Sequence, residues 1–341
     1  MHTSGRLTAL TMGLLLLVGR WPAAAARGFP FHLLHRMTLP AVGPVHALLF
    51  DPQNREIYAA QGRRIVVYAL SGERLAVQRR LAGTVSALAR NGAGEIVAAV
   101  RAPAQLVFLS ARTLTVEHRR ALDADPPTAL LYDRSANMLF LQSRRNGSIV
   151  RVDPASGRAL DQVRLAGALG QMADNGRGTL YVTDATRDVL EVIDARTMRD
   201  EGTIALHWCR APSGLTMDTI GRRLFVGCAN GRALIVDADL GFTFVRLPIP
   251  GGPELRAAFA LHPAGARGWK GGAFFASGGA VAAIQMQAFV RYRAHGQLPL
   301  PSRCTALALA PPVGELWLAL APPPGGRAVL WALGADRSEV E

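Results

Sequence analysis

The sequence predicts an all-β protein, a seven-bladed β-propeller of four-stranded antiparallel blades, from three observations. A strand motif recurs, each unit orders its strands alike, and the chain ends supply complementary parts of one unit. The motif is a polar or glycine position, an aliphatic residue and usually an aromatic one, ending at Tyr58, Val97, Phe140, Tyr181, Phe225, Phe275 and Trp317. Its steps of 39, 43, 41, 44, 50 and 42 residues each match about one propeller blade.

Each unit predicts four strands in the same order. An alternating strand such as 45–51 opens the unit, and a turn of Asn, Asp or Gly leads to the motif strand. A third strand such as 64–70 and a more polar fourth strand such as 74–81 complete the unit. One such sheet cannot bury its faces alone, whereas seven stacked around an axis can. The alternative, a two-sheet sandwich, does not explain the regular step.

The two ends of the chain predict how the ring closes. The last unit supplies strands at 304–309, 315–320 and 328–333 but lacks a fourth. The segment 31–40 (FHLLHRMTLP) is a spare strand that precedes the first complete unit. We therefore expect 31–40 to complete the last blade beside 328–333, which removes an open sheet edge.

The first 26 residues predict a cleaved secretory signal. Arg6 is followed by a 13-residue apolar core at 7–19 and by small residues before Arg27. The alternative is a membrane anchor, but this run is shorter than the roughly 20 residues that span a bilayer. We expect a signal at 1–26, a propeller at 27–333, a polar tail at 334–341 and no membrane span after cleavage. The expected location is periplasmic or secreted.

Two segments carry a family resemblance. TLYVTDATRDVLEVIDARTM (179–198) and PSGLTMDTIGRRLFVGCANGRALIVDAD (212–239) resemble the YVTN-repeat (YncE-like) β-propeller family. Asp184 stands where the YVTN signature has asparagine. The resemblance covers nearly all of 42–333 and is weaker in the second, sixth and seventh units. It implies the propeller fold and export, and it implies no particular reaction.

The composition favours a folded, basic protein. Half of the residues are hydrophobic, 18% are charged and the formal net charge is +13, which excludes a disordered chain. Lys270 is the only lysine, so arginine carries nearly all of the positive charge. Such an arginine bias also arises from a GC-rich genome, so the positions of the arginines say more about function than their number does.

Arginines gather in one class of loop. In an up-and-down blade, the loops between second and third strands share a face with the connections between blades. These loops carry Arg63, Arg64, Arg101, Arg144, Arg145, Arg187, Arg232 and Arg327. His46 begins an inner strand, where it faces the central channel or serves as an ordinary polar lining residue. An arginine-rich mouth attracts anions, and guanidinium binds phosphate or carboxylate bidentately; the alternative is that loops simply hold the charges of an arginine-rich chain.

The sequence predicts no catalytic residues, no metal site and no cofactor. It contains no GxSxG, HExxH or CxxC motif. The aspartates at strand ends are expected to cap turns, because their side chains accept hydrogen bonds from nearby backbone N–H groups; they are Asp51, Asp133, Asp174, Asp194, Asp218 and Asp237.

We therefore expect a binding or interaction protein rather than an enzyme. Its partner would be an anionic small molecule or a protein at the arginine-rich face. A propeller hydrolase of the lactonase type and a single-stranded nucleic-acid-binding protein are the alternatives. Against nucleic acid, only 6% of residues are aromatic, and no platform for stacking bases is evident beside the arginines.

The three cysteines predict one disulfide. Cys209 precedes the first strand of the fifth unit, and Cys228 ends its second strand. Antiparallel pairing around the turn at 218–222 places Cys228 opposite Pro212, within reach of Cys209. Cys304 begins an inner strand two blades away and is expected to be a buried thiol. The alternative is three buried, unbridged cysteines.

Overall fold

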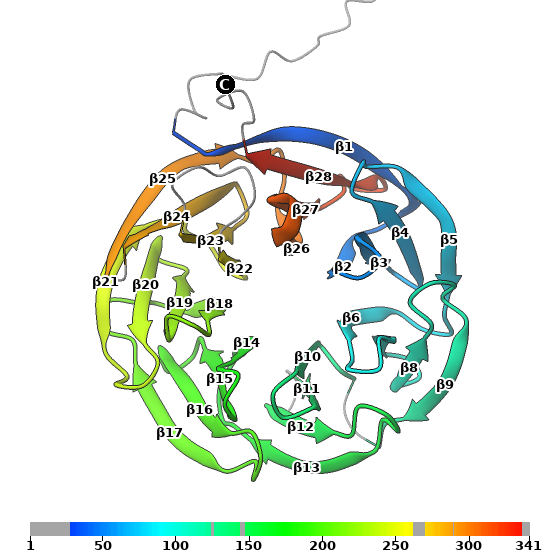
Figure 1. The fold of residues 1–341 in the computed structure, drawn as a ribbon, viewed down its shortest axis with the longest axis horizontal. Helices are drawn as coiled ribbons and strands as arrows, with labels where there is room; N and C mark the ends of the chain where they lie inside the picture. The colour runs from blue at the N-terminus through cyan, green and yellow to red at the C-terminus, as the bar shows by residue number, and fades with distance from the viewer. Residues whose placement is uncertain (1–27, 124–125, 144–146, 262–269, 289, 336–341) are drawn as a thin grey trace, which may run out of the picture.

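The structure, a computed structural model, describes residues 28–123, 126–143, 147–261, 270–288 and 290–335. These residues form seven four-stranded antiparallel sheets arranged in a ring around a central channel (Figure 1). The predicted fold class is confirmed. The predicted signal at 1–26 and the loop residues Arg144 and Arg145 lie outside the described residues. Within the described ranges, no helix is long and apolar enough to cross a membrane.

The first three blades follow one another along the chain. Blade 1 contains β2 (Val45–Asp51), β3 (Glu56–Gln61), β4 (Arg64–Ala69) and β5 (Arg74–Arg80). Blade 2 contains β6 (Val85–Arg90), β7 (Ile96–Val100), β8 (Gln105–Leu109) and β9 (Val116–Ala121). Blade 3 contains β10 (Ala129–Asp133), β11 (Met138–Ser143), β12 (Ser148–Val152) and β13 (Ala159–Arg164).

Blades 4 to 6 repeat this order. Blade 4 contains β14 (Leu169–Asp174), β15 (Thr179–Asp184), β16 (Val189–Asp194) and β17 (Asp200–Ala205). Blade 5 contains β18 (Pro212–Asp218), β19 (Arg223–Cys228), β20 (Arg232–Asp237) and β21 (Thr243–Pro248). Blade 6 contains β22 (Arg256–Leu261), β23 (Gly271–Ala276), β24 (Ala280–Ala288) and β25 (Arg291–Pro299).

Blade 7 joins the two ends of the chain. Its strands are β26 (Cys304–Ala310), β27 (Glu315–Leu320), β28 (Arg327–Ala335) and the N-terminal β1 (Phe31–Val42), and a 3₁₀ turn (Pro311–Val313) separates β26 from β27. The sheet order is β1-β28-β27-β26, and β1 runs antiparallel to β28. The predicted closure by 31–40 is confirmed, and both strands continue two residues beyond the predicted pairing.

Strand burial follows the position of each strand within its blade. Every residue of β7 and β19 is buried, whereas β5 alternates between exposed and half-buried residues. The buried side chains pack between adjacent blades; one cluster joins Tyr181 of blade 4 to Leu224 of blade 5. The hydrophobic effect therefore stabilises mainly the contacts between blades. A single blade alone would leave these side chains exposed to water, so it would not be stable.

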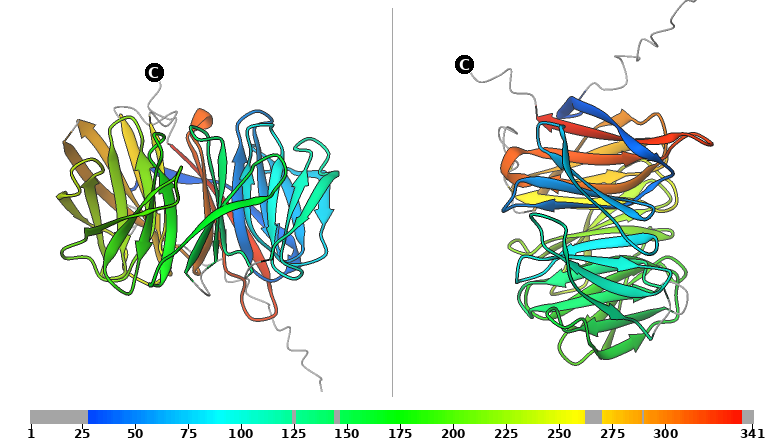
Figure 2. Two further views of the ribbon diagram at one scale, coloured as in Figure 1. Left: turned by 90° about the horizontal axis from the view of Figure 1, so that it is seen from below. Right: turned by 90° about the vertical axis from the view of Figure 1, so that its right-hand side faces the viewer.

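The loops lie on two opposite faces of the ring (Figure 2). We call the entry face the one that holds the connections between blades and the loops between second and third strands. Backbone hydrogen bonds join these two kinds of loop: Val85 N–H donates to Gly62 O at 2.7 Å, and Arg101 N–H donates to Thr84 O at 2.9 Å. The opposite face, the turn face, holds the remaining turns.

The aspartates that follow the first and third strands cap the turns, as predicted. Asp133 Oδ1 accepts from the backbone N–H of Ser135 at 2.7 Å, and Asp218 Oδ1 accepts from that of Gly221 at 2.9 Å. The same bonds form at Asp51, Asp174, Asp194 and Asp237. These carboxylates stabilise the turn face and hold the strand ends in register.

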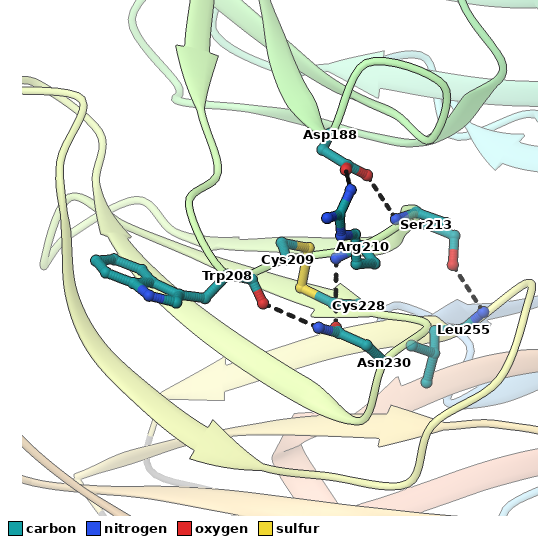
Figure 3. Close-up of a disulfide and its surroundings, with 9 residues drawn as sticks. Asp188, Trp208, Cys209, Arg210, Ser213, Cys228, Asn230 and Leu255 are labelled. Carbon is teal, nitrogen blue, oxygen red and sulfur yellow. Dashed lines mark hydrogen bonds and ion pairs between the residues drawn. A yellow bond between two sulfur atoms is a disulfide. The ribbon is translucent and has the colours of Figure 1, made fainter.

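The predicted disulfide between Cys209 and Cys228 is present (Figure 3). Their Cα atoms are 5.3 Å apart, and Cys228 pairs with Pro212 in the sheet as expected. The bond joins the connection that enters blade 5 to the loop after β19, on the entry face. Cys304 is a buried thiol, and its burial raises its pKa to about 12.

Candidate functional site at the entry mouth of the channel

The entry end of the central channel widens into a cavity of about 400 Å³. The first residues of the inner strands form its wall, since each inner strand starts at the entry face and runs down the channel. Blades 1, 2, 3, 4, 6 and 7 all contribute lining residues. The cavity is therefore a product of the whole ring, and no single repeat could supply it.

Charged side chains collect at this mouth. His46 and Arg101 line it from blades 1 and 2, Glu254 and Arg256 from blade 6, and Arg303 from blade 7, which lies next to blade 1. Arg303 Nη1 lies 2.8 Å from Glu254 Oε2, in an ion pair whose side chains are both about half exposed. Three guanidinium groups thus share the cavity with one carboxylate, which gives the mouth a positive potential.

His46 is held in its neutral form by this setting. Partial desolvation by the channel wall, reinforced by the positive charge of Arg101, lowers its pKa. Near neutral pH the imidazole is therefore an uncharged group that can donate one hydrogen bond and accept another.

The side chain of Gln171 connects three blades at the channel wall. Its Oε1 accepts from the backbone N–H of Ala257 at 2.7 Å and from that of Leu215 at 3.2 Å. Ser86 lines the same cavity and donates from its hydroxyl to Pro127 O at 2.6 Å. The bonds of Gln171 tie blade 4 to blades 5 and 6, and the bond of Ser86 ties blade 2 to the segment that enters blade 3, so the cavity has a fixed polar wall.

Of the predicted site residues that the structure describes, two line the cavity. They are His46 and Arg101. The other described arginines lie outside it: Arg63 is exposed and donates from Nε to Leu81 O at 3.2 Å, Arg64 is half-buried, and Arg232 and Arg327 are exposed. The arginines of the loops between second and third strands are therefore spread over the entry face, and most of those described do not line the channel mouth.

Arg187 is committed to an internal ion pair. Its Nε donates to Asp184 Oδ2 at 2.8 Å, and its Nη2 bonds Glu191. Both carboxylate side chains are fully buried, whereas the arginine is partly exposed. Since its charge balances buried carboxylates of its own blade, Arg187 is a structural residue in this fold.

Sequence reasoning missed Arg256 and Arg303. Each lies at or just before the first strand of its unit, in PELRAAF and PSRCTAL, and not in a loop between second and third strands. The available signal was an arginine shortly after a proline turn at the start of an inner strand. Such a residue lies at the channel mouth in every unit because the inner strands all begin there.

Among the described residues, no group of three or more His, Cys, Asp and Glu side chains is placed so that it could hold a metal ion.

The ring of seven four-stranded blades makes the chain a seven-bladed β-propeller, and the solved structures similar to it include WD40-repeat propellers. The crystal structure of RRP9 WD40 repeats matches with a TM-score of 0.72 and 11% identity, over 89% of this chain and 99% of that one. A chain of the Mitotic Checkpoint Complex matches with a TM-score of 0.72 and 14% identity, over 97% and 99%. The structure of U3-55K gives 0.70 and 12%, over 89% and 99%.

These similarities establish the fold alone. No family model matches the sequence. No curated protein matches it either.

Proposed function

We propose that the protein is an exported binding protein of the YVTN-repeat type that takes an anionic ligand at the entry mouth of its channel. One observation carries the proposal: Arg101, Arg256 and Arg303 line a cavity of about 400 Å³ in which Glu254 is the one carboxylate among the described lining residues. The two segments that resemble the YVTN repeat support the family assignment.

The chemistry of the mouth favours a carboxylate or phosphate group. Guanidinium groups offer paired donors that match the oxygens of these anions. Neutral His46 adds a donor and an acceptor for a hydroxyl or amide elsewhere on the ligand. The solved propellers with similar folds include a component of a protein complex, the Mitotic Checkpoint Complex. An acidic group presented by a protein is thus a reasonable form of the ligand, alongside a small anion.

The double variant Arg101→Gln/Arg256→Gln tests the site. Citrate and inorganic phosphate serve as probes in calorimetric titrations at low and at high salt. We expect the wild type to bind at least one of them more weakly as salt rises, and the variant to bind at least about tenfold more weakly. Arg134→Gln, an exposed arginine in a turn of the opposite face, is the matched control. Equal binding by both variants would place the anion site elsewhere.

Export is supported by the leader sequence and by the disulfide, since disulfides persist in oxidising compartments. Mass spectrometry of the exported protein should give a mature start near Arg27. An intact Met1 in that material would contradict signal cleavage.

A further inference from the structure

An exposed tryptophan lies on the entry face, outside the channel. Trp208, in the connection between β17 and β18, has 56% of its surface exposed. Its backbone has a φ of +69°, which is costly for a bulky residue and persists only where surrounding contacts impose it. The backbone at Trp208 is therefore held in an unfavourable conformation while its ring stays exposed to solvent.

The connection that carries Trp208 is held firmly. The next residue, Cys209, forms the disulfide with Cys228, and Asn230 Nδ2 donates to Trp208 O at 3.0 Å (Figure 3). Asp188 accepts from the backbone N–H of Ala211 at 2.7 Å. The backbone that carries the indole is thus fixed before any partner arrives, and such preorganisation lowers the entropic cost of binding.

One guanidinium group lies over the exposed ring. Arg246 of β21 lies over it, with 3.9 Å between its Cζ and the ring centroid. Arg210 has a side chain that is 80% exposed, and its Nη1 lies 3.4 Å from Asp188 Oδ2. Arg232 begins β20 and pairs in the sheet with Cys228. Trp208, Arg210, Arg232 and Arg246 form what we call the Trp208 patch: Arg246 contacts the ring, and Arg210 and Arg232 are exposed arginines of the same region of the entry face.

We propose that the Trp208 patch docks an acidic segment of a partner protein that carries an aromatic side chain. Tryptophan and arginine are the residues that most often dominate the energy of protein interfaces. The aromatic side chain would lie on Trp208, and the acidic groups would pair with the arginines. This proposal does not depend on anion binding in the channel.

Charge and geometry select this occupant over two others. A second copy of this chain, with its net charge of +13, would bring arginines onto arginines. Proteins that hold single-stranded nucleic acid stack successive bases on several aromatic rings. Among the described residues, the exposed large aromatic side chains are Trp208 and Phe242, and Phe242 lies in the β20–β21 turn on the other face.

Peptide binding tests the patch. The probes are a fluorescein-labelled peptide of glutamates around one phenylalanine, the same peptide with alanine for phenylalanine, a lysine counterpart, and an oligothymidylate, all followed by fluorescence anisotropy. We expect the wild type to prefer the glutamate–phenylalanine peptide over the alanine peptide by at least about tenfold. Absence of that preference, or stronger binding of the lysine peptide, would overturn the proposal.

Variants then show which residues cause the preference for the glutamate–phenylalanine peptide. Trp208→Ala should abolish the preference for phenylalanine, Trp208→Phe should keep most of it, and Phe242→Ala, the matched aromatic on the opposite face, should leave it unchanged. Arg101→Gln/Arg256→Gln should also retain it, which separates this site from the channel mouth. A preference that survives in Trp208→Ala would refute the assignment. Oligothymidylate binding that depends on Trp208, without peptide binding, would point to nucleic acid instead.

The disulfide provides a second variant that does not touch the ring. Cys209→Ser/Cys228→Ser should weaken peptide binding while circular dichroism remains that of a folded propeller. Unchanged binding in that folded variant would contradict the role given to the rigid connection.

Discussion

Asp184 and Glu191 share the guanidinium of Arg187 but respond oppositely to their surroundings. Burial, together with the neighbouring Asp184, raises the pKa of Glu191 despite its bond to Arg187. For Asp184, burial is outweighed by hydrogen bonds from Arg187 and the backbone N–H of Thr186, and the pKa is lowered. As the pH falls, Glu191 therefore takes up a proton before Asp184 does, and the bond of Arg187 to Asp184 helps to keep that carboxylate charged.

Glu191→Gln tests this description through pH. A carboxyl whose pKa is raised in the folded state contributes most below its unfolded pKa and loses that contribution as pH rises through the folded value. The glutamine variant cannot ionise. We expect its stability relative to wild type to improve between about pH 4 and pH 7. Urea denaturation across this range measures it, with exposed Glu201→Gln as the control; a relative stability that falls with rising pH would contradict the assignment.

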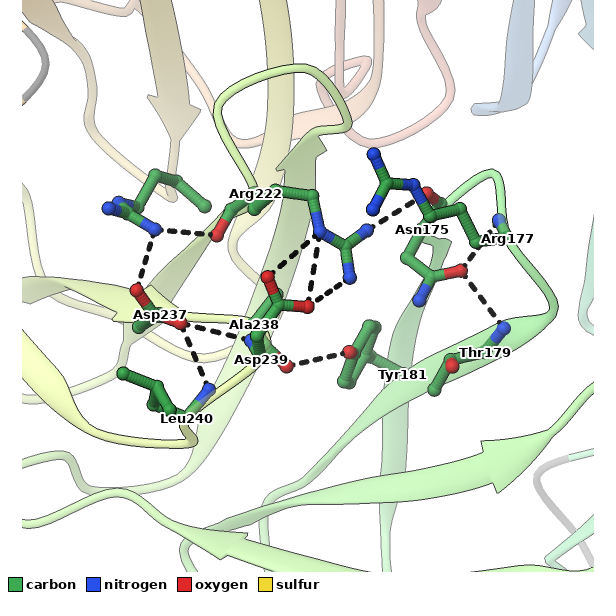
Figure 4. A network of polar contacts seen from close by, with 10 residues as sticks. Asn175, Arg177, Thr179, Tyr181, Arg222, Asp237, Ala238, Asp239 and Leu240 are labelled. Atoms are coloured by element: carbon green, nitrogen blue, oxygen red, sulfur yellow. Dashed lines mark hydrogen bonds and ion pairs between the residues drawn. The ribbon is translucent and has the colours of Figure 1, made fainter.

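At the scale of the element, the motif strands link each blade to the next. Tyr58 of β3 donates its hydroxyl to Ala111 O of blade 2 at 2.6 Å, and Tyr181 of β15 donates to Ala238 O of blade 5 at 2.9 Å. Around Tyr181, Arg222 bonds both Asp239 and Asn175 O, which ties the same two blades together (Figure 4). At these two positions the motif tyrosine thus fills the core and also bonds the neighbouring blade.

Tyr181→Phe should reveal this second role. The ring remains packed, but the carbonyl of Ala238 loses its buried donor, so we expect a loss of about 1 kcal/mol in the free energy of unfolding. Tyr132→Phe removes a hydroxyl that bonds Asn137 within one blade at the surface, and it should cost less. Equal losses in the two variants would show that the inter-blade bond adds nothing.

The repeat could be predicted from the sequence because the features that produce it lie close together in the chain. Strand periodicity, turn aspartates and the motif at Tyr181 lie within one unit, and the disulfide needed only the pairing of two adjacent strands. The channel mouth could not be predicted in this way, because residues from different blades form it. Arg101 and Arg303 line the same cavity although they come from blades 2 and 7.

Surface chemistry was harder to predict for the same reason. In the sequence Trp208 is one of a few scattered aromatics, and Arg246 is one of many arginines 38 residues further on. They meet only because β21 passes beside the connection into blade 5. The sequence could not show this contact, since stacking between distant residues has no sequence signature.

At the scale of the molecule, β1 joins three blades. It completes blade 7 through β28, and Phe31 packs on Phe274 of blade 6 with ring centroids 5.0 Å apart. At its other end, Leu39 is fully buried against blade 1, and Gln61 Nε2 of blade 1 donates to Ala41 O at 2.6 Å. The first strand of the chain thus closes the ring by contacts on both sides, as well as by its own sheet.

The closure predicts a graded loss of stability along β1. Leu39→Ala leaves a cavity between blades 7 and 1 and should cost about 2–5 kcal/mol, whereas Leu33→Ala, on the same strand but 44% exposed, should cost under about 1 kcal/mol. Deleting 27–40 removes the whole strand and exposes β28, so that protein should unfold at the lowest temperature and self-associate through the open edge. Differential scanning calorimetry and light scattering measure both effects. Melting of the deletion at the wild-type temperature would mean that the ring does not depend on β1, because the contacts of Phe31 and Leu39 would then contribute no net stability.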